Sequence, residues 1–297
     1  MLGNIMRRNK ERISMLLFIA PFTVLFITLF LYPLIKGVLF SFTDWNGINP
    51  RLNFIGIQNY INLFTQDNRF LHSLGVTGAY TVVNVIGANV LGLLLALIIE
   101  STASIKNLLR TTFFLPYIFS LVVVGFIWKL IYTKVMTNLY DITGIGFFNL
   151  DFLGDPKLAL TGVLIMSIWQ GLGYYLIIYI AGLQTVDKAL LEAAGIDGAN
   201  RFQRFFNVTL PMLMPSVTIC VFTSIADSLK VFDAIFVLTS GGPGYATEAI
   251  ALNIYNEAFG SANLYGYGMA KAVILAIIIM AISLVQLKFF KSMEVDS

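Results

Sequence analysis

Long apolar runs, separated by short polar stretches, dominate the pattern of this chain. Runs of about 20 apolar residues, the length that a helix needs to cross a bilayer core, occur six times. They lie near residues 13–40, 73–99, 108–132, 158–183, 208–238 and 268–290. Each run predicts one membrane-spanning helix, so we expect an all-α polytopic membrane protein. Pro116 in the third run and Pro211 and Pro215 in the fifth predict kinks rather than breaks, because neighbouring helices can satisfy the freed carbonyls.

Composition supports a membrane location and excludes several other classes. Of the 297 residues, 58% are hydrophobic and 12% are charged, whereas a soluble domain carries about 25% charged residues. That leaves too little polar surface to cover a soluble core. The net charge of +3 is too small to indicate a nucleic-acid partner. The chain has one cysteine, Cys220, and one histidine, His72, so the sequence offers neither a disulfide nor a metal site.

Lysine and arginine residues gather in alternate loops and set the expected orientation. They precede the first run, separate the second from the third and the fourth from the fifth, and follow the last: Arg7, Arg8, Lys10, Arg12, Lys106, Arg110, Lys188, Arg201, Arg204, Lys288 and Lys291. The positive-inside rule places these loops in the cytoplasm. We therefore expect a cytoplasmic N-terminus at 1–12, one six-helix membrane domain at 13–290 and a cytoplasmic tail at 291–297.

The internal loop at 187–207 is too polar to cross a membrane and predicts two short helices. Asp187 can cap the first helix, and Asp197-Gly198 supplies a turn. The second helix then carries an apolar face at i, i+3, i+4 and i+7, which consists of Phe202, Phe205, Phe206 and Thr209. Such an amphipathic helix can lie on lipid or dock in a groove of a partner protein. The pattern alone leaves both possibilities open.

This loop closely resembles the EAA loop of permease subunits of bacterial ATP-binding-cassette importers. The family pattern falls here at Glu192, Ala193 and Ala194, then Asp197, Gly198 and Ala199, and finally Leu210 and Pro211. In that family the loop forms coupling helices that dock into a cleft of the ATPase. The resemblance implies that Glu192 makes the polar contact to the ATPase, that Gly198 forms the turn, and that Arg201 belongs to the same coupling surface. Asp187 replaces a proline that usually precedes the first helix.

Other segments, including "IWQGLGYYLIIYIAGLQ" and "KVFDAIFVLTSGGPGYATEAIALNIYNEAF", look like the carbohydrate-uptake branch of these permeases. The resemblance implies the type I importer permease fold in a bacterial cytoplasmic membrane. It also implies that the chain works with four other proteins: a second, different permease, two ATP-binding subunits and an extracellular solute-binding protein. The cargo would be a sugar. The turn at Gly241, Gly242 and Pro243 would contact the binding protein, unless it is an ordinary loop.

Two polar faces in the fourth and fifth runs are candidates for a sugar path. Sugar hydroxyls need hydrogen-bonding partners, and sugar rings stack on aromatic faces. The spacing i, i+3, i+4, i+7 places Ser167, Gln170, Gly171 and Tyr174 on one helical face, and Ser224, Asp227, Ser228 and Val231 on another. Both sets match positions where maltose-transporter-like permeases contact sugar. Asp227 is a functional candidate because burying a charge in a membrane is costly; the alternative is that Asp227 only pairs with Lys230.

Three other functions explain these residues less well. A secondary transporter or channel explains six spans but gives no role to the EAA pattern. A membrane enzyme lacks any cluster of histidine, cysteine or carboxylate residues, and no G-x-x-x-x-G-K-[ST] loop is present, so ATP and Mg are expected on a separate subunit and no cofactor on this chain. An anionic cargo such as glycerol phosphate would call for arginines or several lysines on the path. We therefore expect an alternating-access permease for a neutral sugar or oligosaccharide.

Overall fold

The computed structural model describes residues 15–101, 105–260 and 264–291, which form helices and connecting loops. The chain divides into two compact units, one of residues 1–66 and 254–274 and the other of residues 67–253 and 275–297. We describe each unit by itself. Residues 1–12 and 292–297 of the two expected terminal segments lie outside the described residues.

Apolar helices confirm the expected class of polytopic all-α membrane protein. Within the described residues, five helices are long and apolar enough to cross a membrane: Met15–Phe40, Asn68–Ser101, Leu121–Thr143, Ala159–Gln184 and Tyr265–Phe289. A bent pair, Arg201–Met212 and Met214–Leu229, makes a sixth span if it counts as one. Two of the six predicted runs nevertheless differ from single kinked helices.

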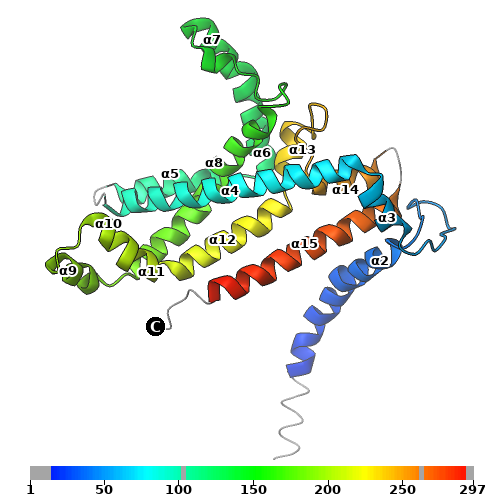
Figure 1. Ribbon diagram of the computed structural model, residues 1–297, viewed down its shortest axis with the longest axis horizontal. Coiled ribbons are helices and arrows are strands. Elements are labelled where there is room, and N and C mark those ends of the chain that lie inside the picture. The colour runs from blue at the N-terminus through cyan, green and yellow to red at the C-terminus, as the bar shows by residue number, and fades with distance from the viewer. Residues whose placement is uncertain (1–14, 102–104, 261–263, 292–297) are drawn as a thin grey trace, which may run out of the picture. The chain divides into compact units, whose positions relative to one another are not determined.

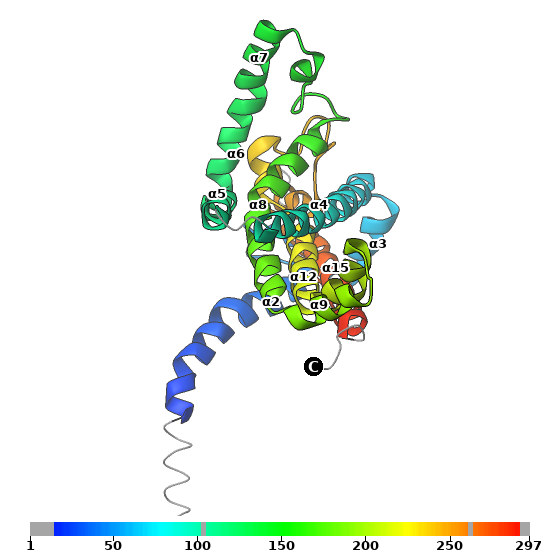
Figure 2. The same ribbon diagram turned by 90° about the vertical axis from the view of Figure 1, so that its left-hand side faces the viewer.

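The third predicted span, 108–132, is divided where one kinked helix was expected. Helix α5 (Lys106–Ile118) contains Pro116 and ends at Phe119, and α6 (Leu121–Leu130) begins after Ser120. Phe119 and Ser120 both have extended backbones, with ψ of 144° and 134°. Figures 1 and 2 show the chain turning sharply between α5 and α6. Helix α6 then continues through the π-helical turn η2 (Ile131–Val135) into α7 (Met136–Thr143), and η3 (Gly146–Asn149) follows.

The fifth predicted span, 208–238, is also interrupted. The elements α10 (Arg201–Arg204), η4 (Phe205–Thr209) and α11 (Leu210–Met212) lead to a 70° bend before α12 (Met214–Leu229). Pro215 explains the bend, because a proline is accepted in the first turn of a helix but clashes with the carbonyl four residues earlier. Helix α12 ends at Leu229, and α13 (Asp233–Leu238) follows after a short non-helical segment.

Three helices form the centre of the second unit: α4 (Asn68–Ser101), α8 (Ala159–Gln184) and α12 (Figure 1). Their shared core is apolar, but one buried polar group joins all three. Asn89 of α4 donates from Nδ2 to Ser224 Oγ of α12 at 3.0 Å, and its Oδ1 accepts from the Tyr179 hydroxyl of α8 at 2.7 Å. Hydrogen bonds of this kind fix which helix faces meet inside a membrane bundle.

Helix α5 packs on α8 at a glycine. A Cβ atom placed on Gly173 would lie 2.5 Å from the Phe113 carbonyl oxygen and 2.7 Å from Phe114 Cα. Both contacts are with backbone atoms, which a side-chain movement cannot relieve. Only a residue without a side chain therefore allows α5 to approach α8 this closely.

The first unit contains the helix Met15–Phe40, which includes η1 (Ile27–Leu31) and α2 (Tyr32–Phe40), together with α3 (Gln58–Thr65). Parts of α14 (Ile250–Phe259) and α15 (Tyr265–Lys291) complete it. Buried Asn59 donates to the carbonyls of Ser41 and Thr43, both at 2.9 Å, and so holds α3 to the end of α2. Asn53 donates to the Asp44 carboxylate from its side chain and backbone, which lowers the pKa of Asp44.

Gly173→Ala should destabilise the protein, because the new methyl group forces α5 away from α8. Overpacking of this kind costs about 1–3 kcal/mol, so the thermal unfolding midpoint of the purified protein should fall. Gly75→Ala in α4 is the matched control, since nothing lies within 4 Å of its Cβ position. Alanine is the better helix former by about 1 kcal/mol, so the control should be neutral or stabilising. Equal midpoints for the two variants would contradict the packing argument.

Candidate functional site

A cavity of about 290 Å³ lies within the second unit, among α4, α5, α8, α12 and the start of α13. Seven of the eight residues predicted for a sugar path line it: Ser167, Gln170, Gly171, Tyr174, Asp227, Ser228 and Val231. The structure therefore brings the predicted faces of α8 and α12 together. Ser224 is the exception, because it is fully buried beside Asn89 and does not line the cavity.

Aromatic rings form one wall of the cavity. Tyr117 of α5 and Tyr174 of α8 have ring centroids 5.3 Å apart, with an interplanar angle of 31°. The Tyr117 side chain is 40% exposed, so part of its ring faces open space. Gln170 lies one turn from Tyr174 on the same face of α8 and supplies both a donor and an acceptor. A flat apolar face of a ligand can therefore stack on the tyrosine rings, while a neighbouring hydroxyl of the ligand forms a hydrogen bond with Gln170.

Three charged residues also line the cavity. Lys230 Nζ lies 3.2 Å from Asp227 Oδ1, and their side chains are 56% and 62% exposed. Asp233 is the third, so two carboxylates and one ammonium give this lining a formal charge of −1. The predicted pairing of Asp227 with Lys230 is therefore present, but an exposed pair contributes only about 0–1 kcal/mol and opens easily for a ligand. Within the described ranges, no three histidine, cysteine, aspartate or glutamate residues gather to hold a metal ion.

Sequence reasoning missed several lining residues, among them Tyr80 and Asn84 of α4 and Tyr117 of α5. Asn84 donates from Nδ2 to Ser228 Oγ at 2.9 Å, which joins α4 to α12 in the cavity wall. The available signal was the i, i+4 spacing of Tyr80 and Asn84, two polar groups within an apolar run. A polar pair on one face of a membrane helix points towards protein or water rather than lipid.

The polar loop forms the two expected helices. Asp187 caps α9 (Lys188–Ile196), since its Oδ1 accepts from the Ala189 amide at 2.8 Å. Gly198 forms the turn with a φ of +82°, a conformation that other residues rarely adopt. Asn200 then begins α10 with a reciprocal capping box, in which Asn200 and Gln203 each accept from the backbone amide of the other.

The helices α9 and α10 expose a surface that mixes apolar and charged groups. Ile196 is 87% exposed and Phe202 is 78% exposed. Among the residues matched to the EAA pattern, Ala193, Ala194 and Asp197 line a largely apolar groove of about 750 Å³ that reaches α11. Glu192 lines an adjacent groove of about 520 Å³ with Arg204, while Ala199 is half-buried and Arg201 is exposed. Exposed apolar groups beside charges are typical of a docking surface.

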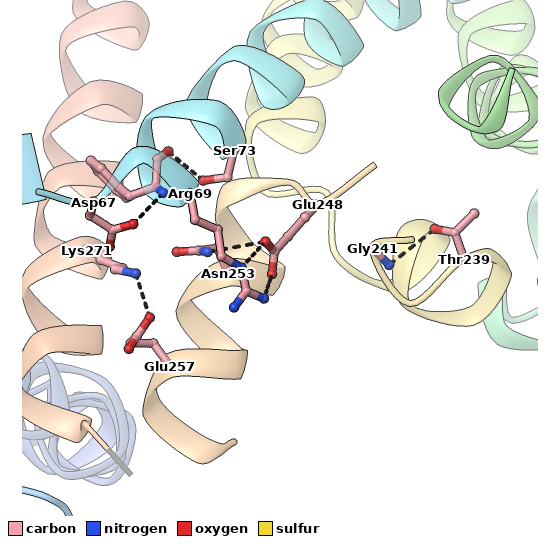
Figure 3. Close-up of polar contacts among 10 residues, drawn as sticks. Asp67, Arg69, Ser73, Thr239, Gly241, Glu248, Asn253, Glu257 and Lys271 are labelled. Atoms are coloured by element: carbon pink, nitrogen blue, oxygen red, sulfur yellow. Dashed lines mark hydrogen bonds and ion pairs between the residues drawn. The ribbon is translucent and has the colours of Figure 1, made fainter. Parts of the chain in front are cut away.

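Hydrogen bonds within the second unit hold the turn at Gly241, Gly242 and Pro243. The Gly241 amide donates to Thr239 Oγ1 at 3.3 Å (Figure 3). Thr247 donates from Oγ1 to the Gly242 carbonyl at 2.8 Å. The next residue, Glu248, is buried and accepts from Arg69 Nε and Nη2 at 2.6 and 2.5 Å. The Arg69 guanidinium also lies 4.0 Å from the centroid of the Tyr245 ring. The turn is therefore fixed to the start of α4.

Comparisons with known proteins place these features in a family. Residues 88–294 match the binding-protein-dependent transport system inner membrane component family. The chain is 39% identical over 287 residues to the probable starch degradation products transport system permease protein AmyD of Thermoanaerobacterium thermosulfurigenes, with 97% of each chain covered. It is 36% identical over 272 residues to the multiple sugar-binding transport system permease protein MsmF of Streptococcus mutans, with 92% of this chain and 93% of MsmF covered.

The fold matches a solved structure over nearly its whole length. A bacterial ABC transporter involved in the import of the acidic polysaccharide alginate contains a chain that superposes with a TM-score of 0.81. The alignment covers 98% of both chains at 24% sequence identity. At this identity the likeness establishes the fold of the helical bundle and says nothing about cargo.

Asn200→Ala should loosen α10 without affecting α9. The variant removes the acceptor for the Gln203 amide, and loss of such a cap costs about 1 kcal/mol. Hydrogen exchange of the amides in 201–204 should therefore accelerate about fivefold, which mass spectrometry can measure. Asp187→Ala is the reciprocal control and should accelerate exchange only at the start of α9. Unchanged exchange in 201–204 would show that the capping box does not stabilise this helix.

Proposed function

Because the chain belongs to the binding-protein-dependent transport system inner membrane component family, we propose that it is the permease subunit of an importer for neutral sugars or oligosaccharides. It is a multi-pass membrane protein of a transporter family, and ATP hydrolysis in such systems lies on a separate subunit. The observation that carries the proposal is the cavity in which Tyr117, Tyr174, Gln170 and Asp227 meet.

The chemistry of the cavity favours a sugar. The tyrosine pair offers aromatic faces to the C–H side of a sugar ring, while Gln170 and Asp227 offer partners to its hydroxyls. The names of AmyD and MsmF, which refer to starch degradation products and to multiple sugars, agree with this cargo class. The lining charge of −1 opposes a phosphate or carboxylate cargo, which would instead need an arginine clamp.

ATP-driven closure of two ATP-binding subunits would move α9 and α10 as a rigid pair. Support comes from the two caps and the Gly198 turn, which make the pair stiff, and from the exposed Glu192 beside apolar grooves. Glu192 would make the polar contact to the ATPase. Alternating access then follows if ATP and the loaded binding protein stabilise different states of the bundle.

Other subunits would complete the importer. In the helix Met15–Phe40, none of the residues in the apolar window is buried, so this helix has a full surface for lipid and for a second, different permease. The Gly241–Pro243 turn would contact the extracellular solute-binding protein, since it is held rigidly by Thr247 and Glu248. The host membrane would be the bacterial cytoplasmic membrane, with α9, α10 and both termini on the cytoplasmic side.

Glu192→Lys should uncouple ATP hydrolysis from transport, because it reverses the charge that contacts the ATPase. In proteoliposomes that contain the full importer and its binding protein, sugar uptake should be lost while ATP hydrolysis continues. The control is Asp141→Asn on α7, which removes an exposed carboxylate outside α9 and α10. It should leave the rates of sugar uptake and of ATP hydrolysis unchanged. Normal uptake by the Glu192 variant would overturn the coupling assignment.

Asp227→Asn should weaken recognition of neutral sugars and change cargo preference. The variant replaces a charged acceptor and leaves Lys230 without its partner at 3.2 Å. A hydrogen bond to a charged group contributes about 1.5–3 kcal/mol, so uptake of the preferred sugar should fall about tenfold or more. Competition by sugar acids should increase, because the lining charge rises from −1 to 0. An unchanged uptake profile across a sugar panel would make Asp227 a structural residue.

A further inference from the structure

A second groove lies between α5 and α8, and the proposed function does not yet use it. Its volume is about 370 Å³. Phe114, Ile118, Ile177 and Ile180 are among its apolar lining residues, and Thr111 and Gln184 lie at its polar end. All of these residues belong to the second unit.

The groove and the cavity share one stripe of residues on each of the same two helices. On α8, Ile177, Ala181 and Gln184 follow Tyr174 at intervals of three, seven and ten residues, which keeps them on one stripe. On α5, Phe114 and Arg110 precede Tyr117 by three and seven residues and form the facing stripe. The groove therefore continues the cavity along α8 towards α9.

Aromatic rings connect the two spaces. The Tyr174 and Tyr117 centroids are 5.3 Å apart, and the Tyr117 and Phe114 centroids are 5.7 Å apart. Three neighbouring rings thus lead from the polar cavity into the groove. From Gln170 to Gln184 the stripe is roughly 20 Å long, at about 1.5 Å per helical residue.

We propose that this groove is the inner half of the sugar path. The inference rests on the proposed function, since it names the route by which cargo leaves the cavity towards the coupling helices. The ring row Tyr174, Tyr117 and Phe114 stacks on successive faces of the sugar as it moves inward. Ile177 and Ile180 make the middle of the groove apolar, which opposes a continuous water column. At the polar end, Thr111 and Gln184 form hydrogen bonds with the sugar hydroxyls.

The charges at the polar end suit release of a neutral cargo. Arg110 bonds through Nη2 to Glu100, and Lys106 Nζ lies 3.6 Å from the same carboxylate. Gln184 Nε2 donates to Glu100 Oε1 at 3.2 Å. Glu100 therefore offsets one of the two cations, so a neutral sugar meets hydrogen-bonding groups without a strong field that would retain an anion.

Cysteine labelling tests the route directly. Cys220 is fully buried and is the one cysteine of this chain, so Cys220→Ala removes the chain's own thiol. The importer that carries this substitution alone, treated with the same reagent, gives the background from cysteines of the other subunits. Thr111→Cys and Ala181→Cys place a thiol in the groove, whereas Thr112→Cys places one on the adjacent, exposed position that does not line it. Each variant is assembled into the full importer in proteoliposomes and treated with a charged methanethiosulfonate reagent. Uptake of radiolabelled maltose, maltotriose, trehalose and arabinotriose is then measured.

The expected result is a loss of uptake after modification at 111 and 181, restored by dithiothreitol, with no loss at 112. If thiols at 111 and 181 do not react while uptake proceeds, lipid or the second permease covers the groove and the inference is wrong. If they react without loss of uptake, the groove is open but lies off the path, and the inference is also wrong. If neither the native importer nor the Cys220→Ala importer takes up any of these sugars, the proposed cargo class itself is wrong.

Phe114 provides an independent check on the ring row. Phe114→Tyr keeps an aromatic face and should retain uptake, whereas Phe114→Leu keeps an apolar side chain without a ring and should slow uptake. Equal uptake by the two variants, at equal amounts of assembled importer, would overturn the role of the rings in the groove.

Discussion

The approach of α5 to α8 at Gly173 determines where the aromatic wall of the cavity lies. Without a side chain at Gly173, the Phe113 carbonyl and the Phe114 Cα can lie close to the α8 backbone. This contact places Tyr117 of α5 beside Tyr174 of α8, with centroids 5.3 Å apart. The cavity and the groove are lined by residues on either side of the same helix pair. A single backbone contact thus sets the geometry of the proposed path.

A second constraint fixes α12 against α4. Asn84 bonds to Ser228 in the cavity wall, and Asn89 bonds to Ser224 deeper in the core. Because each pair joins the same two helices, they hold the register of α12 and with it the position of Asp227. Just beyond Asp227 the helix ends at Leu229, so the charged residues lie where the backbone changes direction. The break supplies a place at which binding can be linked to movement.

Much of the fold could be predicted from the sequence because the signals are local. Apolar runs indicated the spans, and the cap at Asp187 and the turn at Gly198 follow from residue type and position. The break at Phe119 and Ser120 could not be read in this way, since Pro116 indicates only that the helix is perturbed nearby. Pro215 likewise indicated a kink, but residue type alone does not give its angle of 70°.

The sequence predicts which residues of the candidate site share a face of one helix, but it predicts less well which faces of different helices meet. Spacing placed Gln170 with Tyr174 and Asp227 with Ser228, and both pairs line the cavity. The same spacing included Ser224, because a period of 3.6 cannot show which end of a stripe meets a neighbouring helix. The spacing of Tyr80 and Asn84 marks a polar face on α4 but not the helix that this face meets. Tyr117 joins the site through the packing of α5, which no local pattern encodes.

If the cavity belongs to the sugar path, a neutral sugar occupies it while the ATPase is engaged. A cryo-electron microscopy map of the complete importer, trapped with maltotriose, binding protein and a non-hydrolysable ATP analogue, measures this directly. We expect density for a sugar ring beside Tyr117 and Tyr174, within hydrogen-bonding distance of Gln170 or Asp227. Sugar density confined to the partner permease, with this cavity closed or filled by side chains, would contradict it.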